Sequence, residues 1–102
     1  MDAVEFAVRM VDDDDFMLEI MKDMPDTAFG KKASQEDFAQ GMAEAAAKRG
    51  WELDPAELSA CYEKAIEGLG GWGAVKFLRR VKKVMDRAGK SKKELKARGV
   101  AV

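Results

Sequence analysis

The side chains that could do chemistry in this chain are few and lie far apart in the sequence. The chain has no His, which removes the commonest general base and the commonest metal ligand. Cys61 is its single cysteine, so it forms no disulfide within the chain and cannot build a zinc site alone. No serine or cysteine has a histidine partner that could activate it. The sequence therefore predicts no catalytic residue, no metal, no cofactor and no small-molecule substrate, and we expect the protein not to be an enzyme.

Four consecutive aspartates, Asp12–Asp15, carry the oxygen ligands that Ca²⁺ prefers. An EF-hand loop needs a glycine at its sixth position and a glutamate at its twelfth. Counted from Asp12, these positions hold Met17 and Asp23. We interpret the run as a solvated acidic cluster that ends one helix and caps the next, because Asp favours N-cap positions.

Glycines are concentrated in the segment GLGGWG, residues 68–73. Their spacing does not match a dinucleotide-binding loop, and no predicted strand precedes them. Each glycine costs a helix roughly 1 kcal/mol relative to Ala. We therefore predict a helix terminator and flexible joint here, with Gly70 and Gly71 as its hinge or as a cleavage point and with the most accessible backbone between helices.

The rest of the sequence predicts helices. Good helix formers dominate, there are two Pro, and no stretch alternates as a half-buried strand would. Asp54, with Pro55 after it, and Ser34 are strong helix starts, and Ser91 with Glu94 forms a candidate capping box. We predict an all-α fold, a small bundle of about five helices plus a short C-terminal helix. The expected ranges are 2–11, 15–23, Ser34 to Gly50, Pro55 to Leu69, 74–88 and 92–98.

Apolar residues at helical spacing predict the core. In the first helix the expected buried face is Val4, Ala7, Val8 and Val11. The clearest pattern belongs to the fourth helix, where Cys61 is expected as a buried structural thiol. Trp51 and Trp72 flank that helix and are expected to anchor the core or its turns. The core candidates are Leu58, Tyr62, Ile66, Phe38 and Met42, with Leu58 and Ile66 expected to be buried.

Charge divides the chain into two segments. Residues 1–68 hold 17 acidic and 7 basic side chains, and residues 69–102 hold 2 acidic and 11 basic ones, giving −10 and +9. The helix expected over 74–88 has an apolar stripe that includes Leu78, with cations opposite it. The candidate basic binding face is Lys76, Arg79, Arg80, Lys83 and Arg87. We divide the chain into an acidic helical domain, 1–71, and a basic amphipathic tail, 72–102, either packed on the same core or separate from it.

Two segments of the acidic half carry a family resemblance. VEFAVRMVDDDDFMLEIMKDMPD places an amphipathic helix before aspartates and a Met-rich helix, and EDFAQGMAEAAAKRGWELDPAELSACYEKA joins an Ala-rich helix, a Gly-aromatic turn and a Pro-led helix. Together they resemble the nitrogen-fixation-associated Nif-eleven family over about residues 1–71. The matching residues are Phe38, Ala45, Ala46, Gly50, Trp51, Leu53, Glu57 and Leu58.

The resemblance implies a bacterial, cytoplasmic leader domain of a ribosomally made peptide precursor. A modifying enzyme or a transporter would read it, and a protease would cut after the double glycine Gly70-Gly71 and allow export of the C-terminal part. The chain departs from the precursor pattern, because residues 72–102 contain no Cys, no Thr and only Ser91, which lanthionine-type crosslinking would need. Gly68 also stands where such leaders have a larger apolar residue.

Three hypotheses for function remain open. The chain is a leader-like recognition module read by a partner protein, or its basic helix binds an anionic surface, either nucleic acid or membrane, or its charges only solubilise a small helical protein. No apolar run reaches the roughly 18–20 residues that span a bilayer, and no secretory signal begins the chain. The oligomeric state is left open.

Overall fold

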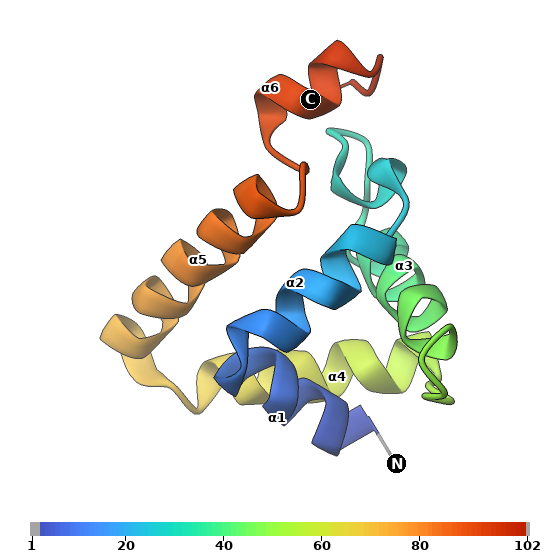
Figure 1. Ribbon diagram of the computed structural model, residues 1–102. Coiled ribbons are helices and arrows are strands. Elements are labelled where there is room, and N and C mark those ends of the chain that lie inside the picture. The colour runs from blue at the N-terminus through green and yellow to red at the C-terminus, as the bar shows by residue number, and fades with distance from the viewer. Residues whose placement is uncertain (1–2, 102) are drawn as a thin grey trace.

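The computed structural model describes residues 3–101, which form helices and no strand (Figure 1). The predicted all-α fold, with five longer helices and a short one near the C-terminus, is confirmed. A 3-10 turn in the loop before the third helix was not predicted. The elements are α1 (Ala3–Asp12), α2 (Asp14–Asp23), η1 (Asp26–Phe29), α3 (Gln35–Ala47), α4 (Pro55–Glu67), α5 (Gly70–Arg87) and α6 (Lys92–Ala97).

Helices α2 and α4 begin where the sequence indicates. The Asp13 carboxylate accepts hydrogen bonds from the backbone N–H groups of Asp15 and Phe16, at 3.0 and 3.1 Å. The Asp54 carboxylate accepts one from Ala56 at 3.1 Å, directly before the proline that opens α4. These bonds satisfy N–H groups that have no partner within the helix, so the aspartates fix both helix starts.

Serines begin α3 and α6. The Ser34 hydroxyl accepts from the Asp37 N–H at 3.1 Å while the Asp37 carboxylate accepts from the Ser34 N–H at 3.0 Å, which is a complete capping box. At Ser91 only the first of the two bonds forms in the described chain, from the Glu94 N–H at 3.3 Å. The capping box predicted there is therefore half present.

An aromatic cluster forms the centre of the core beside α1. Gly50 has a φ of +86°, and the Trp51 N–H donates to the Ala46 carbonyl at 3.1 Å, so the chain turns sharply after α3 and directs Trp51 inward. The Trp51 ring meets Phe6 edge-on with ring centroids 5.4 Å apart, and Phe6 meets Phe16 at the same distance. Trp51 is 4% exposed, which confirms it as an anchor.

The predicted buried face of α1 is wrong by about a quarter of a helix turn. Val4 and Val8 are 58% and 49% exposed, whereas Phe6 and Met10 are fully buried. The aromatic cluster decides this rotation, because a Phe and a Met bury more apolar surface than two valines. Ala7 and Val11 are common to both faces and are buried as expected.

Helix α4 is buried at its start and more open toward its end. Leu58 is buried as predicted, and so is Met42 of α3. Tyr62 and Cys61 are only partly buried, as is Phe38 of α3, which meets the Phe29 ring at 5.6 Å. Ile66 and Cys61, which were expected to be buried, are only partly buried, although both pack against the core. Ile66 lies beside the glycine-rich corner, where small residues supply no side chains to cover it.

The turn between α4 and α5 is shorter than the glycines suggest. Helix α4 ends at Glu67 and α5 begins at Gly70, where the sequence predicts a start at residue 74. Gly70 has a φ of +72°, which makes the change of direction. A Cβ at Gly73 would lie 2.9 Å from the Cβ of Leu69, so this glycine lets the Leu69 side chain lie against the first turn of α5.

Helix α5 lies along one side of the molecule and packs on α2 and α4 (Figure 1). Phe77 and Val84 are buried in the same core as the acidic half, and Val81 and Met85 pack against it. Leu78, expected on this stripe, is 59% exposed. The division after residue 71 falls inside α5, so the basic segment shares this helix and this core with the preceding chain.

Candidate interaction surface

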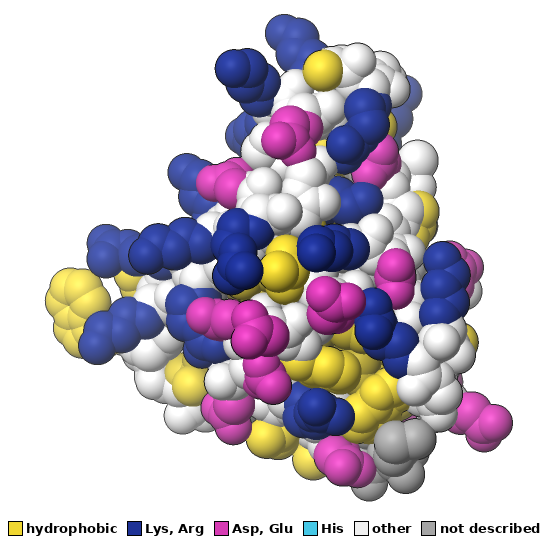
Figure 2. All heavy atoms as spheres, in the orientation of Figure 1, with side chains coloured by type: hydrophobic (Ala, Val, Ile, Leu, Met, Phe, Trp, Pro, Cys, Tyr) yellow, Lys and Arg dark blue, Asp and Glu magenta, His cyan; other side chains and the backbone are white. Residues whose placement is uncertain are grey.

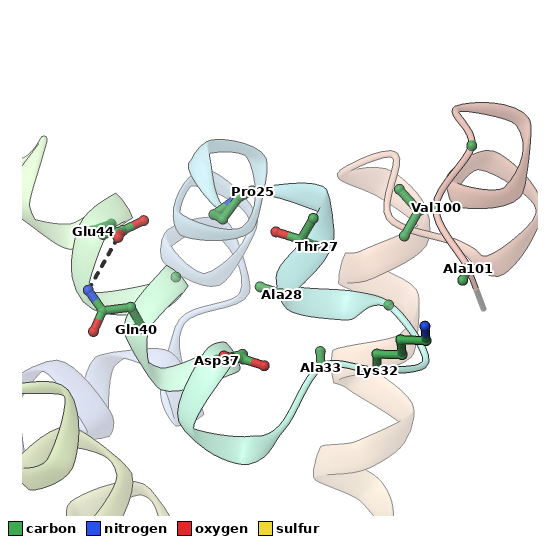
Figure 3. A pocket seen from close by; sticks show the side chains of 13 residues that line it. Pro25, Thr27, Ala28, Lys32, Ala33, Asp37, Gln40, Glu44, Val100 and Ala101 are labelled. Atoms are coloured by element: carbon green, nitrogen blue, oxygen red, sulfur yellow. Dashed lines mark hydrogen bonds between the residues drawn. The ribbon is translucent and has the colours of Figure 1, made fainter.

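A groove lies between η1, α3 and the C-terminal segment, and Figure 3 shows its walls. It encloses about 570 Å³. Three of its polar side chains are engaged, because Asp37 caps α3 and Glu44 accepts a hydrogen bond from the Gln40 amide at 3.2 Å. Among residues 3–101 no three His, Cys, Asp or Glu side chains are grouped so that they could hold a metal ion.

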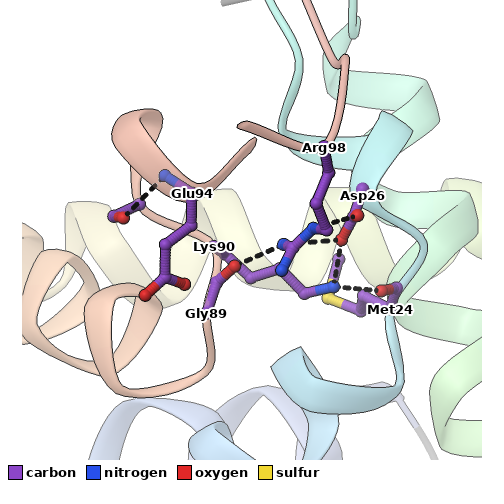
Figure 4. A network of polar contacts seen from close by, with 7 residues as sticks. Met24, Asp26, Gly89, Lys90, Glu94 and Arg98 are labelled. Atoms are coloured by element: carbon purple, nitrogen blue, oxygen red, sulfur yellow. Dashed lines mark hydrogen bonds and ion pairs between the residues drawn. The ribbon is translucent and has the colours of Figure 1, made fainter. Parts of the chain in front are cut away.

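A network of polar contacts ties the C-terminal part of the chain to η1 (Figure 4). The Lys90 Nζ donates to the Asp26 Oδ1 at 2.6 Å and to the Met24 carbonyl at 2.9 Å. Arg98 donates through Nε to the other carboxylate oxygen of Asp26 at 2.8 Å, and also to the Gly89 carbonyl. We call Asp26, Lys90 and Arg98 the C-terminal clasp.

Within the clasp, Lys90 is the most buried charged residue among residues 3–101. Lys90 is 6% exposed, and its Nζ lies 5.6 Å from the centre of the Phe29 ring. The hydrogen bond from Lys90 holds the pKa of Asp26 below its usual value of 3.8, against the opposing effect of burial, and Arg98 adds to the lowering. Sequence patterns gave no signal for this cluster, because Asp26 of η1 lies 64 and 72 residues before Lys90 and Arg98, which stand on either side of α6.

A second ion pair joins the two charge segments near the middle of α5. The Arg80 Nε donates to the Asp14 Oδ1 at 2.8 Å, and the same guanidinium donates to the Val11 carbonyl. Arg80 is therefore directed toward α2 and does not belong to the outward basic face predicted for it. Of the 11 basic side chains in residues 69–102, three pair with acids of the first segment: Arg80, Lys90 and Arg98.

The outer face of α5 carries cations without such partners. Figure 2 shows Lys and Arg side chains gathered on the side of the molecule where α5 lies. The other four residues of the predicted basic face are exposed, and so is Lys82. In the part of the chain that the structure describes, none of the five forms an ion pair. We define the outer face of α5 as Lys76, Arg79, Lys82, Lys83 and Arg87.

Apolar side chains stand next to these cations where α5 begins. Trp72 is 81% exposed, so its predicted role as a core or turn anchor is wrong. Leu69, Val75 and Leu78 are exposed beside it. We call Leu69, Trp72, Val75 and Leu78 the apolar corner. The sequence did contain a signal for the apolar corner, because Trp72 lies on the side of the helix opposite Phe77 and Val84. That signal can be recognised only if the helix is taken to begin at residue 70.

Gly70 and Gly71, the predicted hinge or cleavage residues, lie at this corner and are exposed. Gly70 makes the turn, and Gly71 is already within the first turn of α5. A Cβ at either position would meet nothing within 4 Å. Open space therefore surrounds the backbone here.

None of the helices formed by residues 3–101 has the length and apolar character needed to cross a membrane. The chain was also compared with known proteins. No protein-family model, no curated protein and no solved structure matches it. The surface on α5 therefore has to be interpreted from its own geometry and charge.

Proposed function

We propose that the protein binds a phosphate-rich anionic surface through the outer face of α5. The observation that carries the proposal is the set of five exposed cations on one helix, each without an acidic partner among residues 3–101. A cation left unpaired on a folded surface gains most from an anionic partner, because phosphates release bound counterions when Lys or Arg neutralises them.

The attraction depends on how the charge is distributed, since the net charge of the chain is −1. Charges more than about 8–10 Å from a surface are largely screened at physiological ionic strength. Only the side that faces the partner therefore counts. Asp14 of α2 pairs with Arg80, and the one acidic residue of α5, the exposed Asp86, stands against the five cations of the outer face. An approach along α5 thus presents cations to the partner and keeps most carboxylates in the screened region.

Binding to immobilised inorganic polyphosphate tests the proposal, with the salt concentration varied. The triple variant Lys76→Gln, Arg79→Gln, Lys83→Gln should bind more weakly, and the slope of log affinity against log salt should fall by about two to three phosphate contacts. A matched triple, Lys92→Gln, Lys93→Gln, Lys96→Gln, removes as many cations from α6. Equal losses in the two triples would mean that charge in general, and not the face of α5, drives binding.

A leader-like recognition module read by a modifying enzyme or a transporter is the second candidate, and the exposed Gly70-Gly71 backbone supports it. A protease that cut after Gly71 would need an extended substrate, so the first turn of α5 would have to unwind. Mass spectrometry of the protein from its native cell tests this candidate. A fragment that begins at Trp72 would support it, and an intact chain alone would count against cleavage.

A further inference from the structure

The apolar corner concentrates most of the exposed hydrophobic surface of the molecule. Six large hydrophobic side chains are exposed among the described residues, and four of them are Leu69, Trp72, Val75 and Leu78. In Figure 2 a hydrophobic side chain projects beyond the cations on the side where α5 lies. An exposed Trp has no stabilising role in the fold, so its position calls for a partner.

The corner and the cations share one side of the helix. At about 100° per residue, Trp72, Val75 and Arg79 fall within roughly 60° of one another on α5. Lys76 and Lys83 flank this stripe on one side and Lys82 on the other, while Phe77 points into the core on the opposite side. A flat partner that touches Trp72 therefore meets at least three cations together with it.

Two glycines leave the backbone of the apolar corner uncovered by side chains. Gly70 and Gly71 carry no side chain beside Trp72, and the space that a Cβ would enter is empty at both positions. A flat surface can therefore approach the backbone closely at the start of α5. The Trp72 and Leu69 side chains are then the first groups to reach it.

The mixture of side chains favours a lipid surface over a nucleic acid. Trp is enriched at the boundary between lipid headgroups and acyl chains, where its ring is partly wet and partly in hydrocarbon. Leu69, Val75 and Leu78 have no planar face on which a base could stack, but they gain from entering hydrocarbon. Lys and Arg beside them are placed to contact anionic headgroups, each contributing through the surface potential.

We propose that the folded protein docks on membranes that contain anionic lipid, with the apolar corner among the headgroups and Lys76, Arg79 and Lys83 against the lipid phosphates. This inference rests on the proposed function and names its partner. The docked face is the outward side of α5. The core-facing stripe with Phe77 and Val84 stays buried, so no unfolding is required.

Sedimentation with vesicles tests the proposal. Vesicles of equal parts phosphatidylcholine and phosphatidylserine should bind the full chain, and vesicles of phosphatidylcholine alone should bind it far more weakly. Trp72→Ser should weaken binding to the mixed vesicles roughly 10- to 50-fold, because it removes the largest inserted side chain. The matched control is Val4→Ser with Val8→Ser, which removes two exposed apolar side chains from α1 and should leave vesicle binding unchanged.

Fluorescence adds a readout that locates the ring. Trp51 is buried in the core and Trp72 is exposed, so only Trp72 can change its surroundings on docking. Brominated lipid in the mixed vesicles should quench the wild type, and Trp72→Phe, which keeps an apolar ring at the corner, should bind but lose this quenching. Circular dichroism checks that each variant keeps its helices.

The other outcomes separate the two proposals. Binding to polyphosphate without binding to mixed vesicles would overturn the membrane inference and leave the anionic-surface function standing. Binding to neither would overturn both. Two further results would also overturn the inference: vesicle binding that Trp72→Ser leaves intact, and a Trp72-dependent self-association or oligonucleotide binding in its place.

Discussion

Helices α1 and α5 each expose apolar side chains, but their surroundings differ in charge. On α1, Val4 and Val8 stand among Glu5 and Asp12, and the only cation of the helix, Arg9, lies 4.3 Å above the Phe16 ring. On α5, the apolar corner stands among unpaired cations. The outer faces of the two helices thus both expose apolar side chains, but the charged residues around those side chains have opposite sign.

This difference shows how an exposed apolar side chain should be interpreted. Single exposed valines are common on protein surfaces and need no explanation. A Trp that projects next to cations is different, because both groups can be satisfied by one partner that is anionic outside and apolar inside. Charge near the apolar group, more than apolar area, therefore distinguishes the candidate docking face from ordinary surface.

The inner faces of the two helices offer the strongest test of how firmly each is held. Phe6→Ala and Phe77→Ala should each lower the free energy of unfolding by about 3–5 kcal/mol, since both rings are buried. The loss for Phe6→Ala should lie at the upper end of this range, because the Phe6 ring contacts two aromatic rings, whereas the Phe77 ring contacts only that of Tyr62, at 5.9 Å. Urea titration measures both. A loss under about 1 kcal/mol for Phe77→Ala would show that α5 is barely attached.

Replacing cations of α5 by acids would make the charge around its apolar corner negative, as it is around the exposed valines of α1. Lys76→Glu with Arg79→Glu should lower affinity for anionic vesicles by about 3 kcal/mol, or roughly 150-fold, while the apolar corner stays intact. The same reversal on α6, Lys92→Glu with Lys96→Glu, is the control. If the α5 variant kept its affinity for anionic vesicles, apolar contact alone would explain docking. The charge difference between α1 and α5 would then not explain why only α5 docks.

The clasp holds the far end of α5, and α1 has no equivalent. Asp26→Asn should destabilise the protein by about 2–3 kcal/mol, because it leaves the Lys90 charge buried without its counter-ion. Asp23→Asn is the matched control. Asp23 pairs with the more exposed Arg49 at 3.0 Å and should cost under about 1 kcal/mol. Similar losses for the two variants in thermal unfolding would contradict a special role for the clasp.

Acid should weaken the clasp, because Asp26 must be ionised to pair with Lys90 and Arg98. The pKa of Asp26 is lowered in the folded state, so its stabilising effect is fully present above about pH 3.8 and is lost as the pH falls below that value through the folded pKa. At the alkaline end, burial raises the pKa of Tyr62 from its usual 10, so stability should fall above pH 10. Unfolding followed against pH in wild type and Asp26→Asn separates the acid effect, which the variant should lack.

The smallest expected effect concerns the glycines, which α5 has and α1 lacks. Gly71→Ala should stabilise the protein by about 0.5–1 kcal/mol, because Gly71 is helical and a Cβ there meets nothing. Gly70→Ala should instead destabilise it by about 1 kcal/mol, since a φ of +72° strains any residue with a Cβ. Opposite signs in denaturant midpoints would locate the turn at one residue. Equal signs would indicate a longer joint.

The fold and the capped helix starts could be predicted from the sequence, because caps and helix composition are local signals, but the uncapped start of α5 could not. Ser34 and Asp54 cap their helices as expected, and within the predicted capping run Asp12–Asp15 the cap is Asp13. The rotation of α1 could not be predicted, since it depends on Trp51, 45 residues away from Phe6 in the chain. Contacts between residues far apart in the chain decide which face of a helix is buried, and the apolar pattern of one helix does not reveal those contacts.

The candidate site was predicted in part. The cations of α5 were identified from their spacing, but Arg80 was assigned to the wrong side, because its partner Asp14 is 66 residues away. Trp72 was misassigned because four glycines were interpreted as a break, whereas three of them lie in the helix. The leader-like role and the cleavage after Gly71 stay predictions.

The clasp also has a consequence for the order in which parts of the native protein open. It joins positions 64 and 72 residues apart, and α6, with six residues, is too short to persist by itself. Opening the clasp therefore means losing α6 as one unit while the aromatic cluster stays closed. Amide hydrogens of α6 should exchange with solvent faster than those of α1, on the timescale of a local opening far cheaper than global unfolding.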